Sequence, residues 1–200
     1  MKVREAVSYL PFAVVGGTHV AAKLLPHRAL DRATKPFLMP LLGIRLLVAR
    51  RRIPRLLLGS MALSWIGDLT IDRSFRTGLA AFLLGHVLLV ALLWRGMRGR
   101  LSPWSLLLIP WVIFDVVVMR PRSGVLFPAI VGYALVLAAM ATSAGRGNRR
   151  TRVGAVLFVV SDTTLALRQF TPWLRSHRWG AVVMATYIAA QALLVDGVTD

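Results

Sequence analysis

The sequence contains no cysteine, which excludes disulfide bonds, thiolate nucleophiles and thiolate metal ligands. The HExxH and HxxxH pairs of helical metal sites and the GxSxG turn of many serine hydrolases are absent as well. Acidic residues are scarce, with 8 Asp and Glu against 25 Lys and Arg and a net charge of +17. The chemistry left open is therefore that of carboxylates, imidazoles and hydroxyl groups in a strongly basic chain.

Charge is absent from four long stretches of the chain. Residues 6–22, 77–94, 123–145 and 179–195 contain no Asp, Glu, Lys or Arg. A helix of about 20 apolar residues crosses a bilayer, and in lipid only helices and closed barrels pair all their backbone groups. The alternating pattern of barrel strands is absent, and 56% of the residues are hydrophobic, with a mean hydropathy of +0.66. The sequence therefore predicts an all-α, polytopic membrane protein.

Four further apolar stretches each contain one internal charge, and they bring the number of predicted transmembrane helices to eight. The eight are predicted at residues 6–25, 35–49, 55–71, 77–94, 102–119, 124–144, 153–170 and 179–195. We expect the whole chain, residues 1–200, to form a single integral membrane domain. In this domain the helices pack around a polar cavity within the membrane.

Most basic residues lie in the short connections between the apolar stretches. Anionic lipid headgroups are the natural partners of Lys and Arg there, so we expect contacts with membrane lipids and no nucleic-acid partner. With an inside N-terminus, 14 of the 25 basic residues lie on the inner side and 11 on the outer side. This bias places both termini in the cytoplasm. Arg outnumbers Lys 22 to 3, which is typical of a GC-rich genome, and we expect the inner membrane of a bacterial cell.

The internal charges are the first candidates for function, because ionisable groups inside a membrane are rare and usually functional. They are Arg45, Asp68, Asp115 and Asp162. Asp115 lies close to Arg120 and Arg122, so an interfacial ion pair explains it about as well as a function does. Asp68 and Asp162 are solitary carboxyls that are hard to retain without a function. We therefore expect these two to face the polar cavity.

Further polar side chains lie on the same helix faces as these carboxyls. Ser64 precedes Asp68 by four residues, and Tyr187 precedes Gln191 by four, so each pair shares one face of its helix. The predicted substrate-binding residues of the cavity are Lys35, Ser64, His86, Ser161, Tyr187 and Gln191. Each also has a structural explanation: a serine bonded to the backbone, a packed ring, or a lysine that reaches the headgroups.

Two buried carboxyls are suited to acid–base catalysis. Burial and mutual repulsion favour one protonated and one ionised group, which supplies an acid and a base together. Asp162 lies nearer the middle of its helix than Asp68, so we expect it to be more desolvated and to donate the proton. A metal site built from His19, His86 and both carboxyls is the main chemical rival, and nucleophilic attack by Ser64 is another.

Five segments in succession carry a resemblance to a known family. They are residues 35–42 (KPFLMPLL), 64–68 (SWIGD), 75–86 (FRTGLAAFLLGH), 154–162 (GAVLFVVSD) and 187–191 (YIAAQ). In this order they resemble the YhhN family of multi-pass membrane proteins, the lysoplasmalogenases. The resemblance implies a function in lipid metabolism. A lysoplasmalogen, which is a lysophospholipid, would be hydrolysed at its vinyl ether bond to a fatty aldehyde and a glycerophospho-base.

The resemblance also implies that Asp68 and Asp162 are the catalytic carboxyls. Protonation of the vinyl ether creates an oxocarbenium ion that water attacks, as in glycoside hydrolysis, and this needs no metal or organic cofactor. Two alternatives stay open. One is a non-catalytic, proton-coupled transporter of lipids or small solutes, which would use the same carboxyls. The other is a metal-dependent amide hydrolase of the intramembrane type.

Overall fold

The computed structural model describes residues 3–49 and 51–199, and this part of the chain is helical, without any strand. Its α-helices are α1 (Val3–Leu24), α2 (Arg28–Thr34), α3 (Leu38–Val48), α4 (Arg55–Thr70), α5 (Phe75–Gly96), α6 (Leu108–Met119), α7 (Phe127–Ala144), α8 (Arg149–Phe170) and α9 (His177–Thr199). Short 3-10 helices lead into α3, α6 and α7; they are η1 (Lys35–Phe37), η2 (Pro103–Leu107) and η3 (Gly124–Leu126). The predicted all-α class is confirmed for the described residues.

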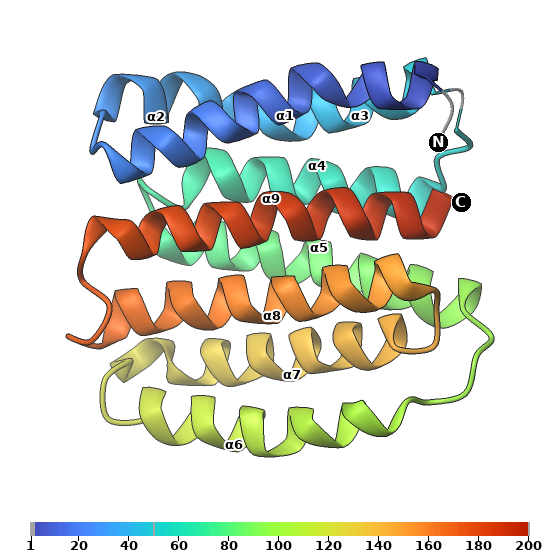
Figure 1. Cartoon of the computed structure of the whole chain (residues 1–200). Helices are drawn as coiled ribbons and strands as arrows, with labels where there is room; N and C mark the ends of the chain where they lie inside the picture. Colours follow the sequence, from blue (N-terminus) through green and yellow to red (C-terminus); the bar gives the residue numbers. More distant parts are fainter. Residues whose placement is uncertain (1–2, 50, 200) are drawn as a thin grey trace.

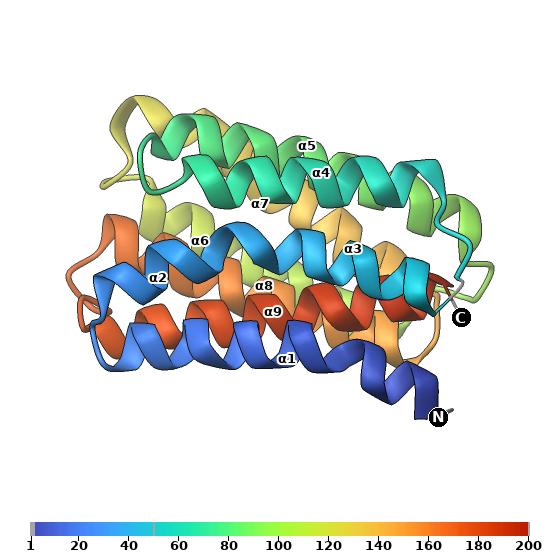
Figure 2. The same ribbon diagram turned by 90° about the horizontal axis from the view of Figure 1, so that it is seen from above.

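Each predicted helix has a counterpart in the structure. Consecutive long helices run in opposite directions, and both termini lie at the same end of the bundle (Figure 1). The prediction missed α2, because its sequence RALDRAT is short and polar and hydropathy detects only apolar runs. The His27 side chain caps α2 by accepting a hydrogen bond from the Leu30 amide at 3.3 Å. Seen from above, α2 leads directly into α3 (Figure 2).

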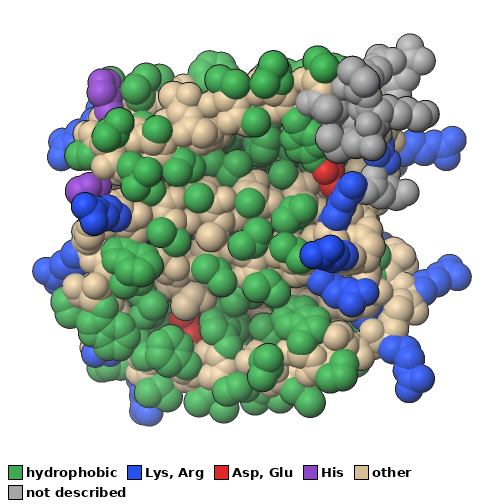
Figure 3. Space-filling model, viewed as in Figure 1, with side chains coloured by type: hydrophobic (Ala, Val, Ile, Leu, Met, Phe, Trp, Pro, Cys, Tyr) green, Lys and Arg blue, Asp and Glu red, His purple; other side chains and the backbone are tan. Residues whose placement is uncertain are grey.

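Among the described residues, four helices are long and apolar enough to cross a membrane. They are Phe75–Gly96, Gly124–Ala144, Arg149–Phe170 and His177–Thr199. The outer surface is apolar as well, since Leu47, Leu107 and Val117 are 64–68% exposed. Figure 3 shows hydrophobic side chains over the middle of one face, with Lys and Arg gathered at the two ends. Such a surface is that of a multi-pass membrane protein with lipid around its middle.

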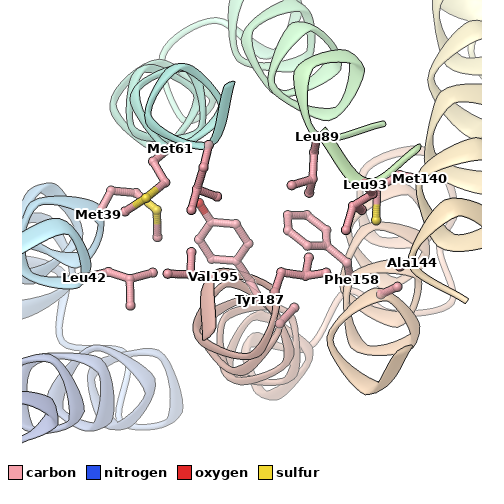
Figure 4. Packing of buried hydrophobic residues seen from close by; sticks show 14 of the residues in the cluster. Met39, Leu42, Met61, Leu89, Leu93, Met140, Ala144, Phe158, Tyr187 and Val195 are labelled. Atoms are coloured by element: carbon pink, nitrogen blue, oxygen red, sulfur yellow. The ribbon is translucent and has the colours of Figure 1, made fainter. Parts of the chain in front are cut away.

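Helix α9 lies at the centre of the bundle. It packs against α8 and α1, between which it lies in Figure 1. Leu93 of α5, Met140 of α7 and Leu194 of α9 are at most 1% exposed, and they belong to the halves of these helices nearest the termini. Figure 4 shows Tyr187 of α9 and Phe158 of α8 next to this core. Large apolar side chains thus fill the half of the bundle that carries the termini.

The internal charge of Arg45 is neutralised inside the bundle. Arg45 on α3 forms a salt bridge with Asp196 on α9, and its guanidinium lies 3.7 Å from the centroid of the Tyr9 ring. The Tyr9 hydroxyl donates a hydrogen bond to the same carboxylate. The predicted last helix ends at residue 195, one residue before this partner. Arg45 therefore ties α1, α3 and α9 together as a buried charge with a paired counter-ion.

Gly78 permits close contact between α5 and the end of α4. A Cβ at this position would lie 2.5 Å from the Cα of Ile71. We expect Gly78→Ala to lower the free energy of unfolding by about 1–3 kcal/mol, because backbone must shift to admit the methyl group. Gly132→Ala on α7 is the matched control, since a Cβ there meets nothing within 4 Å. Chemical unfolding in detergent compares the variants, and equal stability of Gly78→Ala and wild type would contradict the contact.

Candidate active site

A cavity of about 340 Å³ lies in the half of the bundle away from the termini. Its walls come from the C-terminal parts of α4 and α8, the N-terminal parts of α5, α7 and α9 and the middle of α6 (Figure 1). Lys23 at the end of α1 and Lys35 of η1 complete them. Five of the predicted site residues line it: Lys35, Asp68, Ser161, Asp162 and Tyr187. The structure therefore brings the two predicted carboxyls, one from each half of the chain, to one chamber.

Asp68 is held by a tyrosine from the opposite half of the chain. Its side chain lies on the last turn of α4 and is 4% exposed. The Tyr187 hydroxyl of α9 donates a hydrogen bond of 2.8 Å to Asp68 Oδ2. A Cβ on the neighbouring Gly67 would lie 2.7 Å from the Phe82 ring, so glycine lets that ring approach. Phe82 meets Tyr187 edge to face at a centroid distance of 5.9 Å, which fixes the donor.

Asp162 has the same arrangement with another tyrosine. The Tyr133 hydroxyl of α7 donates a hydrogen bond of 2.5 Å to Asp162 Oδ2 on α8. Tyr133 is absent from the predicted site, although a tyrosine near the middle of a charge-free run signals a buried hydrogen-bond partner. Asp162 is partly exposed, whereas Asp68 is 4% exposed. The expectation that Asp162 is the more desolvated carboxyl stays a prediction, because both carboxyl groups are enclosed by the protein.

His86 lies outside the cavity wall, behind Tyr133. Its ring meets Phe158 and Tyr133 at steep angles, with centroids 4.5 and 5.5 Å apart. The His86 Nδ1 lies 2.8 Å from the Phe82 carbonyl oxygen, which can only accept, so we assign the proton to Nδ1. Nε2 is buried and has no hydrogen-bond partner within the described ranges. The imidazole thus supports the aromatic wall of the cavity and does not open onto it.

Ser64 and Gln191 also lie outside the cavity wall, bonded to each other. Gln191 Nε2 donates to Ser64 Oγ at 3.1 Å. This bond joins α4 to α9. The hydrogen bond from Tyr187 to Asp68, one helical turn away, joins the same two helices. Ser161 does line the cavity, and its hydroxyl donates to the Val183 carbonyl at 3.1 Å, which ties α8 to α9. The predicted polar residues therefore divide into a cavity wall and a supporting layer behind it.

Basic side chains gather where the cavity approaches the end of the bundle. Lys23, Lys35 and Arg168 all line it. The first two are paired, Lys23 with Asp31 at 2.7 Å and Lys35 with Asp72 at 2.6 Å. The Arg168 Nε is buried without a hydrogen-bond partner in the part of the chain that the structure describes. These cations suit an anionic group such as a phosphate.

Asp115 on α6 is one of four carboxyls in the cavity wall, with Asp68, Asp72 and Asp162, and it is 4% exposed. Of the two explanations left open for Asp115, the ion pair with Arg120 or Arg122 is not found among the described residues. Arg122 instead donates to the Val118 carbonyl at 2.6 Å and lies 5.5 Å from the centroid of the Trp173 ring. Both arginines lie beyond Met119, where α6 ends, so helical spacing no longer applies to them.

Residues 3–49 and 51–199 contain no group of three or more His, Cys, Asp or Glu side chains that could hold a metal ion. His19, a candidate ligand of the rival metal site, belongs to a separate cluster on α1 and α2. Its ring nitrogens lie 2.8 Å from the Thr34 hydroxyl and 3.4 Å from Asp31. His19 does not line the cavity.

The sequence model of the YhhN family matches residues 30–198 of this chain. The chain is similar to lysoplasmalogenase TMEM86B of Sus scrofa, with 34% identity over 146 residues that cover 68% of this chain and 60% of that protein. The Homo sapiens protein of the same name is 33% identical over 146 residues, which cover 70% and 62% of the two chains. The chain thus spans about three fifths of the length of these curated relatives. No solved structure matches it.

Asp72 lies in the connection after α4, outside the membrane-spanning helices. Partial burial opposes its ionisation, but the charge of Lys35 and the hydrogen bond from its ammonium outweigh burial and hold the pKa of Asp72 below its ordinary value of 3.8. The pair therefore contributes its full stability above about pH 4 and loses it as the pH falls through the lowered pKa. We expect Lys35→Met to raise this pKa toward 3.8, as measured by NMR titration of labelled aspartate. An unchanged midpoint would contradict the pairing.

Proposed function

This chain belongs to the YhhN family, and on that basis we propose that it is a membrane hydrolase acting on lysolipids. The proposed reaction cleaves the vinyl ether bond of a lysoplasmalogen or a related lysolipid, and the name of the TMEM86B relatives supports it. The products are a fatty aldehyde and a glycerophospho-base.

The observation that carries the proposal is the shared cavity of two carboxyls. Asp68 of α4 and Asp162 of α8 both line it. The Oδ2 atom of each carboxyl accepts a hydrogen bond from a tyrosine hydroxyl. This arrangement leaves the Oδ1 atom of each carboxyl for a substrate or a water molecule. Cleavage of the vinyl ether requires two carboxyls that reach the same bound molecule.

The reaction adds one molecule of water to the vinyl ether. One carboxyl gives its proton to the carbon atom farther from the ether oxygen, and the adjacent carbon becomes part of an oxocarbenium ion. The other carboxylate stabilises this cation and takes a proton from the attacking water. The resulting hemiacetal breaks its bond to the glycerol oxygen, which releases the aldehyde and the glycerophospho-base. Asp68 and Asp162 fill these two roles.

The remaining walls suit a single-chain phospholipid. Apolar side chains such as Ile130, Leu137 and Met184 line the cavity and can contact an acyl-like chain. Lys35 and Arg168 lie near the end of the bundle, where they can bind the phosphate. Among the other predicted site residues, we assign Ser161 and Tyr187 to the cavity wall. Ser64, His86 and Gln191 belong to the layer that positions it.

The proposed setting is the inner membrane of a bacterial cell, with one domain of eight membrane-crossing helices and both termini in the cytoplasm. Two observations support this topology. Consecutive long helices run in opposite directions, and both termini lie at one end, as an even number of crossings requires (Figure 1). The bias of basic residues favours that end as the cytoplasmic one.

Replacing either carboxyl by its amide tests the proposal directly. Asp68→Asn and Asp162→Asn keep the shape of the side chain but can neither donate an acidic proton nor accept one from water. We expect each to lower aldehyde release by at least about a hundredfold, as loss of general acid or base catalysis does. Gly132→Ala on α7 is the control, because a Cβ there meets nothing within 4 Å and Gly132 does not line the cavity, so it should stay near wild type. Aldehyde formation from purified protein and alkenyl lysolipid is measured, with thermal unfolding to verify folding. Near-normal activity of either variant would remove that residue from the mechanism.

A second test concerns metal ions. Because the proposed chemistry uses carboxyl groups alone, we expect prolonged treatment with EDTA and then dialysis to leave the rate of aldehyde release unchanged. Loss of activity that added zinc or magnesium restores would favour the metal-dependent alternative. Buffer of the same ionic strength without chelator serves as the control.

A further inference from the structure

Asp115 is a buried carboxyl that the proposed reaction does not use. It is 4% exposed on α6 and lines the same cavity as the catalytic pair. Asp68 and Asp162 each accept a tyrosine hydroxyl. Asp72 pairs with Lys35. Within the described residues, by contrast, no hydrogen bond or salt bridge reaches Asp115. The Asp115 oxygens are accessible from the cavity, so a bound cation can reach them. A carboxylate without a counter-charge is costly inside a membrane protein, so this part of the cavity lacks a complementary group.

Trp111 lies one helical turn before Asp115 and lines the same cavity. Its indole N–H donates to the Thr163 hydroxyl at 2.9 Å, which fixes the ring and uses its only donor. What Trp111 offers to the cavity is therefore its aromatic surface. An aromatic surface next to a carboxylate is the combination that recognises alkylammonium groups, through cation–π attraction and charge pairing.

The charges of the cavity wall are separated in space. Lys23 and Lys35 come from α1 and η1, whereas Asp115 comes from α6, and Figure 1 places α1 and α6 at opposite edges of the bundle. Neither lysine pairs with Asp115, because both have other carboxylate partners. The phosphate and the ammonium of one headgroup are joined by only two carbon atoms, so the lysines do not serve a headgroup whose amine lies at Asp115. The cation left for its phosphate is Arg168, which lines the cavity and whose Nε has no hydrogen-bond partner within the described residues.

The depth of Asp115 fits such a ligand as well. Trp111 is bonded to Thr163, the residue after Asp162, so the indole lies at the level of the catalytic carboxyl. Asp115 is four residues further along α6, which is about 6 Å nearer the end of the bundle. The glycerol and phosphate of a lysophospholipid can span that distance between the ether bond and the amine.

We infer that Asp115 and Trp111 form a subsite for the ammonium group of a lipid headgroup. Asp115 thereby makes the protein prefer headgroups that carry an amine over headgroups that carry none. This inference rests on the proposed function for the class of lipid, but the ammonium contact itself does not depend on bond cleavage.

Activity with three headgroups tests the subsite. Asp115→Asn removes the negative charge of the side chain, and Asp115→Glu retains it. The substrates are alkenyl lysolipids of one chain length with choline, ethanolamine or phosphoglycerol headgroups. We expect Asp115→Asn to lower kcat/KM for the two amine-bearing lipids by about tenfold or more, mainly through KM. The rate with the phosphoglycerol lipid should stay unchanged or rise, and Asp115→Glu should keep the preference. An equal fall for all three substrates, or no change for any, would overturn the inference.

Binding of analogues that cannot be cleaved separates this inference from the proposed function. Saturated alkyl-ether lysolipids with the same three headgroups are titrated into wild type and Asp115→Asn by calorimetry. If wild-type protein cleaves no vinyl ether, the hydrolase proposal is refuted. If it nevertheless binds the amine-bearing analogues about tenfold more tightly than the phosphoglycerol analogue, and Asp115→Asn loses this preference, the subsite is supported. Wild-type protein that binds all three analogues equally would overturn the subsite whether or not the variant folds.

Discussion

Two hydrogen bonds from tyrosine hydroxyls to buried aspartates hold the polar half of this molecule together. A carboxyl surrounded by apolar side chains is destabilising unless a donor reaches it. Tyr187 supplies that donor to Asp68 and joins α9 to α4; Tyr133 supplies it to Asp162 and joins α7 to α8. The same two bonds therefore satisfy the acids and set the positions of four helices around the cavity.

The position of Tyr187 shows how closely the site and the core are coupled. Its hydroxyl reaches Asp68, while its ring packs edge to face against Phe82 and Phe158, with centroids 5.9 and 5.6 Å apart. Figure 4 places this ring among the buried apolar side chains of the core. A side chain that belongs to both regions leaves the carboxyl little freedom to move, which is how a polar site stays ordered inside an apolar bundle.

Much of this arrangement could be predicted from local sequence. Apolar runs located the long helices because the length of such a run is a local property, and Asp68 and Asp162 stood out as charges inside two of these runs. The partners of these charges could not be predicted, because they are chosen by helix packing between distant segments. Tyr133 lies in a run without charge, and Asp196 lies one residue past a predicted helix end, so neither was assigned to the carboxyl or the arginine that it binds. For Asp115, closeness in sequence to Arg122 made an ion pair one of two open explanations, and the end of α6 prevents that pair.

The two ends of the bundle are not equivalent. The core of large apolar side chains fills the half that carries the termini, while the cavity lies in the other half. In the proposed hydrolase, the cavity lies at the level of one leaflet, so lysolipids of that leaflet reach it directly and lysolipids of the other leaflet must first cross the bilayer. The turnover of such a protein would then follow the asymmetry of the bilayer as much as the total amount of lipid.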